Sequence, residues 1–113
     1  MNDKQRLAQM PEAAREATEL AHGATREELD SDRRTLYAVA FALSMVGEEA
    51  AHLSADFRDS HSQVEWGLII GMRNRLIHGY RSINTDVVWE TLQSALPALI
   101  EQLERLIPLD DES

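Results

Sequence analysis

The chain has 113 residues, of which 20 are acidic and 11 are basic, and its formal net charge is −9 with the histidines neutral. A chain of this length forms one domain with its own core, so we expect residues 1–113 to fold as a single helical domain. The absence of cysteine excludes disulfides, thiolate metal sites and a cysteine nucleophile. The polar start and the lack of an apolar run of ~20 residues predict a cytoplasmic protein with no signal peptide and no membrane partner.

Apolar residues recur at helical spacing along almost the whole chain, and no segment alternates as a half-buried strand would. The first predicted helix ends at Gly23, and Pro11 either kinks this helix or marks its first turn. The segment 25–28 has the spacing of a capping box, which predicts a short additional helix. A second long helix is predicted over roughly 31–54.

The second half of the chain is predicted to form two more helices. A polar connection over 57–62 leads into a third helix over roughly 62–80. A fourth helix covers 85–107 and is interrupted at Pro97. A short acidic tail follows over 110–113. The fold class predicted from this pattern is all-α, a four-helix bundle with a short extra helix.

The acidic residues are unevenly distributed along the chain. Residues 66–85 contain no carboxylate but do contain His78 and three arginines, Arg73, Arg75 and Arg81. We call this segment the basic island. A basic island in an acidic protein is where an anionic ligand would bind, although arginines on a helix also serve simply as solvated surface or as partners in i,i+4 ion pairs.

The third predicted helix also carries more apolar surface than one amphipathic helix usually buries. The residues concerned are Trp66, Met72, Leu76 and Ile77. An apolar face left over in a bundle of this size predicts a homodimer interface.

The basic island has the side chains needed to cleave RNA without a metal. Asn74 and His78 lie one above the other on a helix, and Arg73 and Tyr80 project from the same half of it. In such cleavage the neighbouring 2′-hydroxyl is the nucleophile, so the protein supplies proton transfer and charge stabilisation. Histidine suits the first task near neutral pH and arginine the second, while Asn74 would hydrogen-bond the imidazole. A single histidine on a helix is, however, also a common core or surface hydrogen-bonding group.

The sequence of residues 66–80, WGLIIGMRNRLIHGY, closely resembles the signature of HepT-like proteins of the HEPN superfamily. The family motif Arg-x4-His-x-Tyr falls on Arg73, His78 and Tyr80. The segments VGEEA at 46–50 and DVVW at 86–89 resemble further parts of the family pattern. Two residues depart from the family pattern. Pro11 lies in the first helix, which the family continues unbroken, and Phe41 lies where the family often has a polar or basic residue.

This resemblance implies a four-helix HEPN bundle that forms a homodimer, with a composite, metal-independent ribonuclease site at the dimer interface. It implies a toxin that cleaves RNA and is encoded beside a minimal nucleotidyltransferase antitoxin, which silences it by transferring AMP to a tyrosine. No cofactor, metal or DNA partner is implied.

The resemblance also assigns roles to individual residues. Arg73 and His78 would be the catalytic pair, with Asn74 in a supporting role. Tyr80 would be the AMP acceptor, since a nucleotide added there would occupy the position of the RNA phosphate. Two further arginines would contact RNA, namely Arg75 and Arg81.

Three alternatives remain open from the sequence. Glu49 and His52 have the i,i+3 spacing found in carboxylate-bridged metal sites. Such a site needs a second pair of this kind, and the sequence has none. Polar-face or interhelical hydrogen-bonding roles are therefore favoured for Glu48, Glu49 and His52. His61 lies in a predicted loop, from where it would serve as an accessory contact if the loop reaches the site. Finally, the same helix would suit a non-catalytic module that binds a nucleotide or a nucleotidyltransferase.

Overall fold

All regular structure in the described part of the chain is helical. The computed structural model describes residues 1–107, and that range contains no strand. The α-helices are α1 (Asp3–Leu20), α2 (Arg26–Ser31), α3 (Arg33–His52), α4 (Ala55–Ser60), α5 (Trp66–His78), α6 (Thr85–Glu90) and α7 (Leu96–Leu106), with a 3-10 turn η1 (Tyr80–Ser82) and a π-helical segment η2 (Thr91–Ala95). The predicted all-α class is confirmed. The predicted acidic tail over 110–113 lies outside the described residues.

The first helix begins earlier than Pro11 and continues through it. Asn2 and Gln5 form a reciprocal capping box that fixes the start of α1 at Asp3. Pro11 therefore does not mark the first turn. It lies in the middle of α1, and its side chain is buried in the protein. Proline has no N–H, so the carbonyl of Leu7 loses its helical hydrogen bond at this point. Gly23, at a φ of +83°, then turns the chain out of α1 toward α2.

The predicted polar connection over 57–62 is wrong, because most of it is the helix α4. The Ser54 hydroxyl accepts a hydrogen bond from the Phe57 N–H and caps this helix, and the Asp3 carboxylate in turn binds the Ser54 N–H and hydroxyl. Phe57 stacks on His61. The third predicted helix accordingly starts at Trp66 and not near residue 62.

The last helical segment changes its hydrogen-bond pattern just before its internal proline. In η2 the Leu96 N–H bonds to the Thr91 carbonyl, five residues back, and Pro97 then sits in the first turn of α7. The helical run predicted over 85–107 is thus irregular at Thr91–Ala95, a few residues before the predicted interruption at Pro97, which itself lies in the regular first turn of α7.

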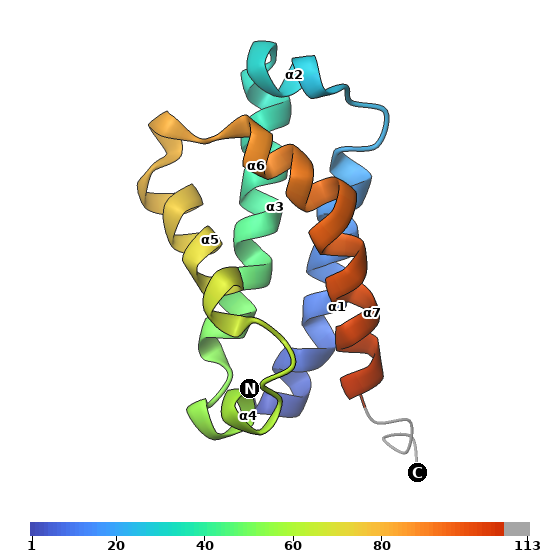
Figure 1. Ribbon diagram of the computed structural model, residues 1–113, viewed down its shortest axis with the longest axis vertical. Helices are drawn as coiled ribbons and strands as arrows, with labels where there is room; N and C mark the ends of the chain where they lie inside the picture. The colour runs from blue at the N-terminus through green and yellow to red at the C-terminus, as the bar shows by residue number, and fades with distance from the viewer. Residues whose placement is uncertain (108–113) are drawn as a thin grey trace.

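The helices pack around α1 and α3, which lie side by side along the long axis of the molecule (Figure 1). The helix α5 packs on α3, whereas α7 packs on α1 and α6 on α2. The core between them is made of aliphatic side chains, including Leu7, Met10, Val39, Leu43, Val46, Leu96 and Leu103. The helix α5 packs mainly against α3. Within the described residues, the side of α5 that faces away from α3 is therefore largely uncovered by other helices.

No helix within residues 1–107 has the length and apolar character needed to cross a membrane.

Candidate active site

The last two turns of α5 bring together three of the predicted site residues. Asn74 and His78 are exposed and lie one turn apart on the open side of the helix. Arg73 is adjacent and half-buried toward α3. Gly79 caps the helix, so His78 is its last residue and Tyr80 belongs to the following turn, η1. Five residues separate Arg73 from His78, so the two side chains share one end of α5 but point about 140° apart around the helix.

Two side chains hold the guanidinium of Arg73. Its Nε and Nη2 atoms lie 3.1 and 2.8 Å from the same carboxylate oxygen, Oε1 of Glu48 on α3. Its Nη1 donates to the amide oxygen of Asn74 at 2.7 Å. The predicted contact between Asn74 and the imidazole of His78 is therefore replaced by a contact with Arg73. The sequence predicts only a polar-face or interhelical role for Glu48. The signal that points to it as a partner of Arg73 is its place in the VGEEA segment at 46–50.

A close approach of two helices makes the contact between Glu48 and Arg73 possible. A Cβ atom placed on Gly47 would lie 2.3 Å from the Cβ of Arg73 and 2.9 Å from the backbone oxygen of Ile69. Such distances do not occur between real atoms of this kind, so only glycine allows α3 and α5 to be this close here. The neighbouring Glu48 is thereby within reach of the arginine.

Tyr80 faces α3 and lies at one end of an apolar groove. Its ring meets the ring of Tyr37 edge to face, with the centroids 6.3 Å apart, and the guanidinium of Arg81 lies 5.5 Å from its centroid. The groove, of about 320 Å³, runs between α3 and the end of α5 and is lined by Tyr37, Ala40, Phe41, Ser44, Leu76, Ile77, Tyr80 and Ile83. Among the described residues, the Tyr80 hydroxyl makes no hydrogen bond, and the side chain is 47% exposed.

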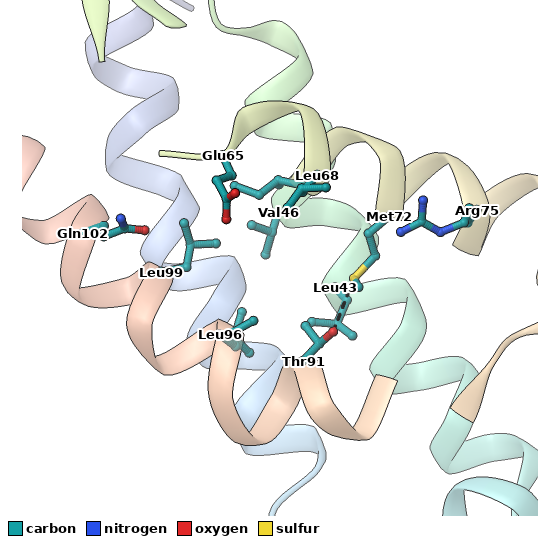
Figure 2. Close-up of a pocket in the computed structure, with 12 residues that line it drawn as sticks. Leu43, Val46, Glu65, Leu68, Met72, Arg75, Thr91, Leu96, Leu99 and Gln102 are labelled. Atoms are coloured by element: carbon teal, nitrogen blue, oxygen red, sulfur yellow. Dashed lines mark hydrogen bonds between the residues drawn. The ribbon is translucent and has the colours of Figure 1, made fainter. Parts of the chain in front are cut away.

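The arginines of the basic island do not share one surface. Arg75 lies about 200° around α5 from Arg73 and borders a second pocket, of about 290 Å³, between α5, α3 and the η2–α7 segment. Figure 2 shows this pocket, with Leu68 and Met72 on one wall and Leu96 and Leu99 on the other. Arg73, Asn74, His78 and Tyr80 do not line it. Arg75 is therefore separated from the side of α5 on which Arg73 contacts α3.

The other histidines and acids considered from the sequence lie elsewhere or have partners. The ring of His61 stacks on Phe57, and the backbone carbonyl of His61 accepts a hydrogen bond from the Trp66 indole. His61 therefore lies near the first residue of α5, whereas His78 is its last, about 18 Å further along this 13-residue helix. Glu49 forms an ion pair with Arg6 of α1 at 3.1 Å. The interhelical roles predicted for Glu48 and Glu49 are thus confirmed.

Comparison with known proteins decides the family. The family model described as "Ribonuclease HepT-like" matches residues 10–106. The chain belongs to the HepT-like ribonuclease family. Its all-α fold is accordingly of the HEPN type, and the resemblance noted in residues 66–80 is confirmed by a match that covers most of the chain.

Several curated proteins are similar over most of their length. "Putative RNase TTE0752" of Caldanaerobacter subterraneus subsp. tengcongensis is 34% identical over 89 residues, which is 79% of this chain and 80% of that protein. "Probable ribonuclease HepT" of Thermococcus cleftensis is 34% identical over 95 residues, covering 80% of this chain and 86% of that protein. "Putative RNase MJ0127" of Methanocaldococcus jannaschii is 32% identical over 83 residues, 74% of this chain and 69% of that protein. No solved structure gives a significant match.

Proposed function

We propose that this protein is a metal-independent endoribonuclease and the toxin of a toxin–antitoxin pair. The observation that carries the proposal is one end of α5, which holds an exposed His78 together with an arginine whose guanidinium is bound by Glu48 and Asn74. Membership in the HepT-like ribonuclease family and the names of the relatives support RNA as the substrate.

The chemistry follows from these two side chains. A neutral imidazole removes the proton from the 2′-hydroxyl of the RNA, whose oxygen attacks the adjacent phosphorus while the bond to the 5′-oxygen breaks. A protonated imidazole returns a proton to that 5′-oxygen, which leaves a 2′,3′-cyclic phosphate and a 5′-hydroxyl. Arg73 stabilises the negative charge that accumulates on the phosphorus-bound oxygens.

Proton removal and proton return take place on opposite sides of the phosphorus, so two imidazoles serve this reaction better than one. Within residues 1–107, α5 itself carries one histidine, His78. A two-fold dimer would bring a second copy of His78 and Arg73 to the same cleft. We therefore propose a composite site between two copies, formed at the end of α5 that carries His78.

Silencing would act through Tyr80. Its hydroxyl is exposed and makes no hydrogen bond to the described residues, so it is available as a nucleophile toward the α-phosphorus of ATP held by the antitoxin. Attack there joins AMP to the tyrosine oxygen and releases pyrophosphate. The added phosphate would introduce negative charge and bulk two residues from His78, where the RNA backbone has to lie.

The decisive test is a cleavage assay on RNA in the presence of EDTA. We expect the wild-type protein to cleave, and we expect Arg73→Ala and His78→Ala each to abolish cleavage while circular dichroism and oligomeric state stay unchanged. Matched controls are Arg105→Ala, an arginine 74% exposed on α7, and His22→Ala, an exposed histidine after α1; both should cleave normally. A wild-type protein that cleaves no RNA would favour a non-catalytic nucleotide- or nucleotidyltransferase-binding module.

The silencing step has its own matched pair of variants. Tyr80→Phe should retain cleavage but gain no AMP when incubated with the antitoxin and ATP, as measured by mass spectrometry. Tyr37→Phe removes the hydroxyl of the tyrosine that contacts Tyr80 and should still be modified. An adduct on Tyr80→Phe would show that another residue is the acceptor.

A further inference from the structure

The carboxylate of Glu48 occupies one defined edge of the Arg73 guanidinium. Both the Nε–H and one Nη2–H of this arginine point to the same oxygen, Oε1, at 3.1 and 2.8 Å. The two side chains are 27% and 31% exposed, so the pair lies partly inside the α3–α5 contact and is less screened by solvent than a surface ion pair.

The remaining donors of Arg73 form a fork. A guanidinium carries five N–H groups; Glu48 accepts from two and Asn74 accepts from one, on Nη1. Within residues 1–107, one N–H on each terminal nitrogen is left without a partner. Two such N–H groups, one from each terminal nitrogen, suit bidentate contact with two phosphate oxygens.

His52 lies on the other side of Glu48. The Nδ1 atom of His52, one turn further along α3, lies 3.5 Å from the second carboxylate oxygen, Oε2, and 2.8 Å from the backbone oxygen of Glu48. Gly47, the preceding residue, sets the short distance between α3 and α5. The backbone of Glu48 therefore has a fixed place on α3, and its carboxylate aligns a long and otherwise mobile arginine side chain.

We propose that Glu48 is a positioning residue for Arg73, holding one edge of the guanidinium so that its terminal N–H groups face the scissile phosphate. This inference rests on the proposed ribonuclease function. Glu48 contributes through alignment and in spite of its charge, because a carboxylate beside the site repels the RNA backbone. Replacement of Glu48 should therefore slow cleavage if alignment matters more, and should leave cleavage unchanged or speed it if charge repulsion matters more.

Three variants separate alignment from charge. Glu48→Ala removes the acceptor, and we expect kcat to fall roughly a hundredfold, the scale of a misplaced catalytic group, with a smaller change in KM. Glu48→Gln keeps an oxygen that both N–H groups can reach, because the native contacts use only one oxygen, so it should retain much of the activity. Glu49→Gln alters the adjacent carboxylate, which pairs with Arg6 on α1, and should cleave as the wild type does.

Other outcomes would overturn the proposal. If Glu48→Ala and Glu48→Gln both cleave as fast as the wild type or faster, Glu48 acts as a counter-charge and not as a positioning residue. If Glu48→Gln is as impaired as Glu48→Ala while both remain folded and dimeric, the charge is required and the alignment argument is wrong.

A measurement independent of cleavage keeps this inference separate from the proposed function. The Nε–H resonance of Arg73 can be followed by NMR during titration with a 2′-O-methyl dinucleotide, which carries the phosphate but cannot be cleaved. The wild-type protein and Glu48→Gln should show a protected Nε–H that responds to the dinucleotide, and Glu48→Ala should lose the protection and bind more weakly. Normal binding and protection in Glu48→Ala would refute positioning, whereas a wild-type protein that shows these signals but cuts no RNA would refute only the ribonuclease proposal.

Discussion

A single glycine, Gly47, sets the distance between α3 and α5, the two helices that build the candidate site. Gly47 lies opposite Arg73, and a methyl group there would overlap the arginine Cβ and the backbone of Ile69. Its neighbour Glu48 provides the carboxylate that holds the guanidinium. The position of Arg73 thus depends on a residue with no functional group of its own.

We predict that Gly47→Ala impairs both stability and cleavage. The added methyl must push α3 and α5 apart, which costs about 1–3 kcal/mol for overpacking, and the shift moves Arg73 away from Glu48. Urea unfolding measures the first effect and the RNA cleavage assay the second. Gly67→Ala is the matched control, since a Cβ there meets no atom within 4 Å and alanine favours helix; its stability should be unchanged or slightly higher. A Gly47→Ala protein as stable and active as the wild type would show that this glycine does not set the helix distance.

At the scale of helices, side-chain caps mark the starts of α1, α2, α3, α4 and α6. The capping box at Thr25 was readable from the sequence because both partners lie within four residues. The helix α4 was not predicted, because its cap Ser54 is held by Asp3, a contact between residues 51 positions apart. Local signals were thus sufficient for the long helices but not for an element stabilised by a distant partner.

The candidate site shows the same division between local and distant information. The motif residues Arg73, His78 and Tyr80 share a short segment, so their common position on one helix end followed from helical spacing. The contact between Glu48 and Arg73 depends on how far α3 is shifted along α5, which no local pattern encodes. For the same reason the sequence does not predict that the amide oxygen of Asn74 accepts from Nη1 of Arg73.

The cap of α3 predicts a specific pH dependence of stability. Asp32 accepts hydrogen bonds from the Thr35 hydroxyl and from the backbone N–H groups of Thr35 and Arg34, which hold the pKa of its carboxyl below the ordinary value. Because the pKa is lower in the folded state, this stabilisation is complete at neutral pH. It is lost as the pH falls below the ordinary aspartate pKa of about 3.9 and through the folded value.

We therefore predict that Asp32→Asn matches the wild type at pH 7 and becomes relatively more stable in acid, because asparagine caps a helix equally well but does not titrate. Asp32→Ala should lower Tm by a few degrees at pH 7 and approach the wild type as the pH falls well below the ordinary aspartate pKa of about 3.9. Thermal unfolding followed by circular dichroism between these pH values measures both. If the Tm curves of the three proteins run parallel across the whole range, the carboxylate of Asp32 is not responsible for the acid sensitivity.

At the scale of the whole molecule, the structure revises which apolar and charged residues are available at the surface. Trp66 and Leu76 were predicted to belong to a leftover apolar face, but they are only 6% and 8% exposed and belong to the core. The apolar side chains that remain exposed along the α3–α5 groove are Tyr37, Phe41, Ile77 and Tyr80. The positive charge of the basic island is also smaller than its sequence suggests, because Glu48 of α3 forms an ion pair with Arg73.

This apolar face is the surface on which we expect a second copy to pack, since it is continuous with the end of α5 that carries His78. Phe41 is 66% exposed, so Phe41→Ser should leave the monomer folded while removing apolar surface from both halves of a two-fold interface. Burial of one such side chain contributes about 1.5–3 kcal/mol, and the dimer Kd should therefore rise at least about tenfold. Sedimentation equilibrium measures this change.

Cleavage by Phe41→Ser should fall at low protein concentration and recover at high concentration, because the composite site forms only in the dimer. The matched control is Leu68→Ser, which replaces a residue 64% exposed on the opposite flank of α5, beside the second pocket. It should dimerise and cleave normally. Dissociation of Leu68→Ser but not of Phe41→Ser would move the interface to the α5–α7 side, and efficient cleavage by a strictly monomeric wild-type protein would rule out a composite site.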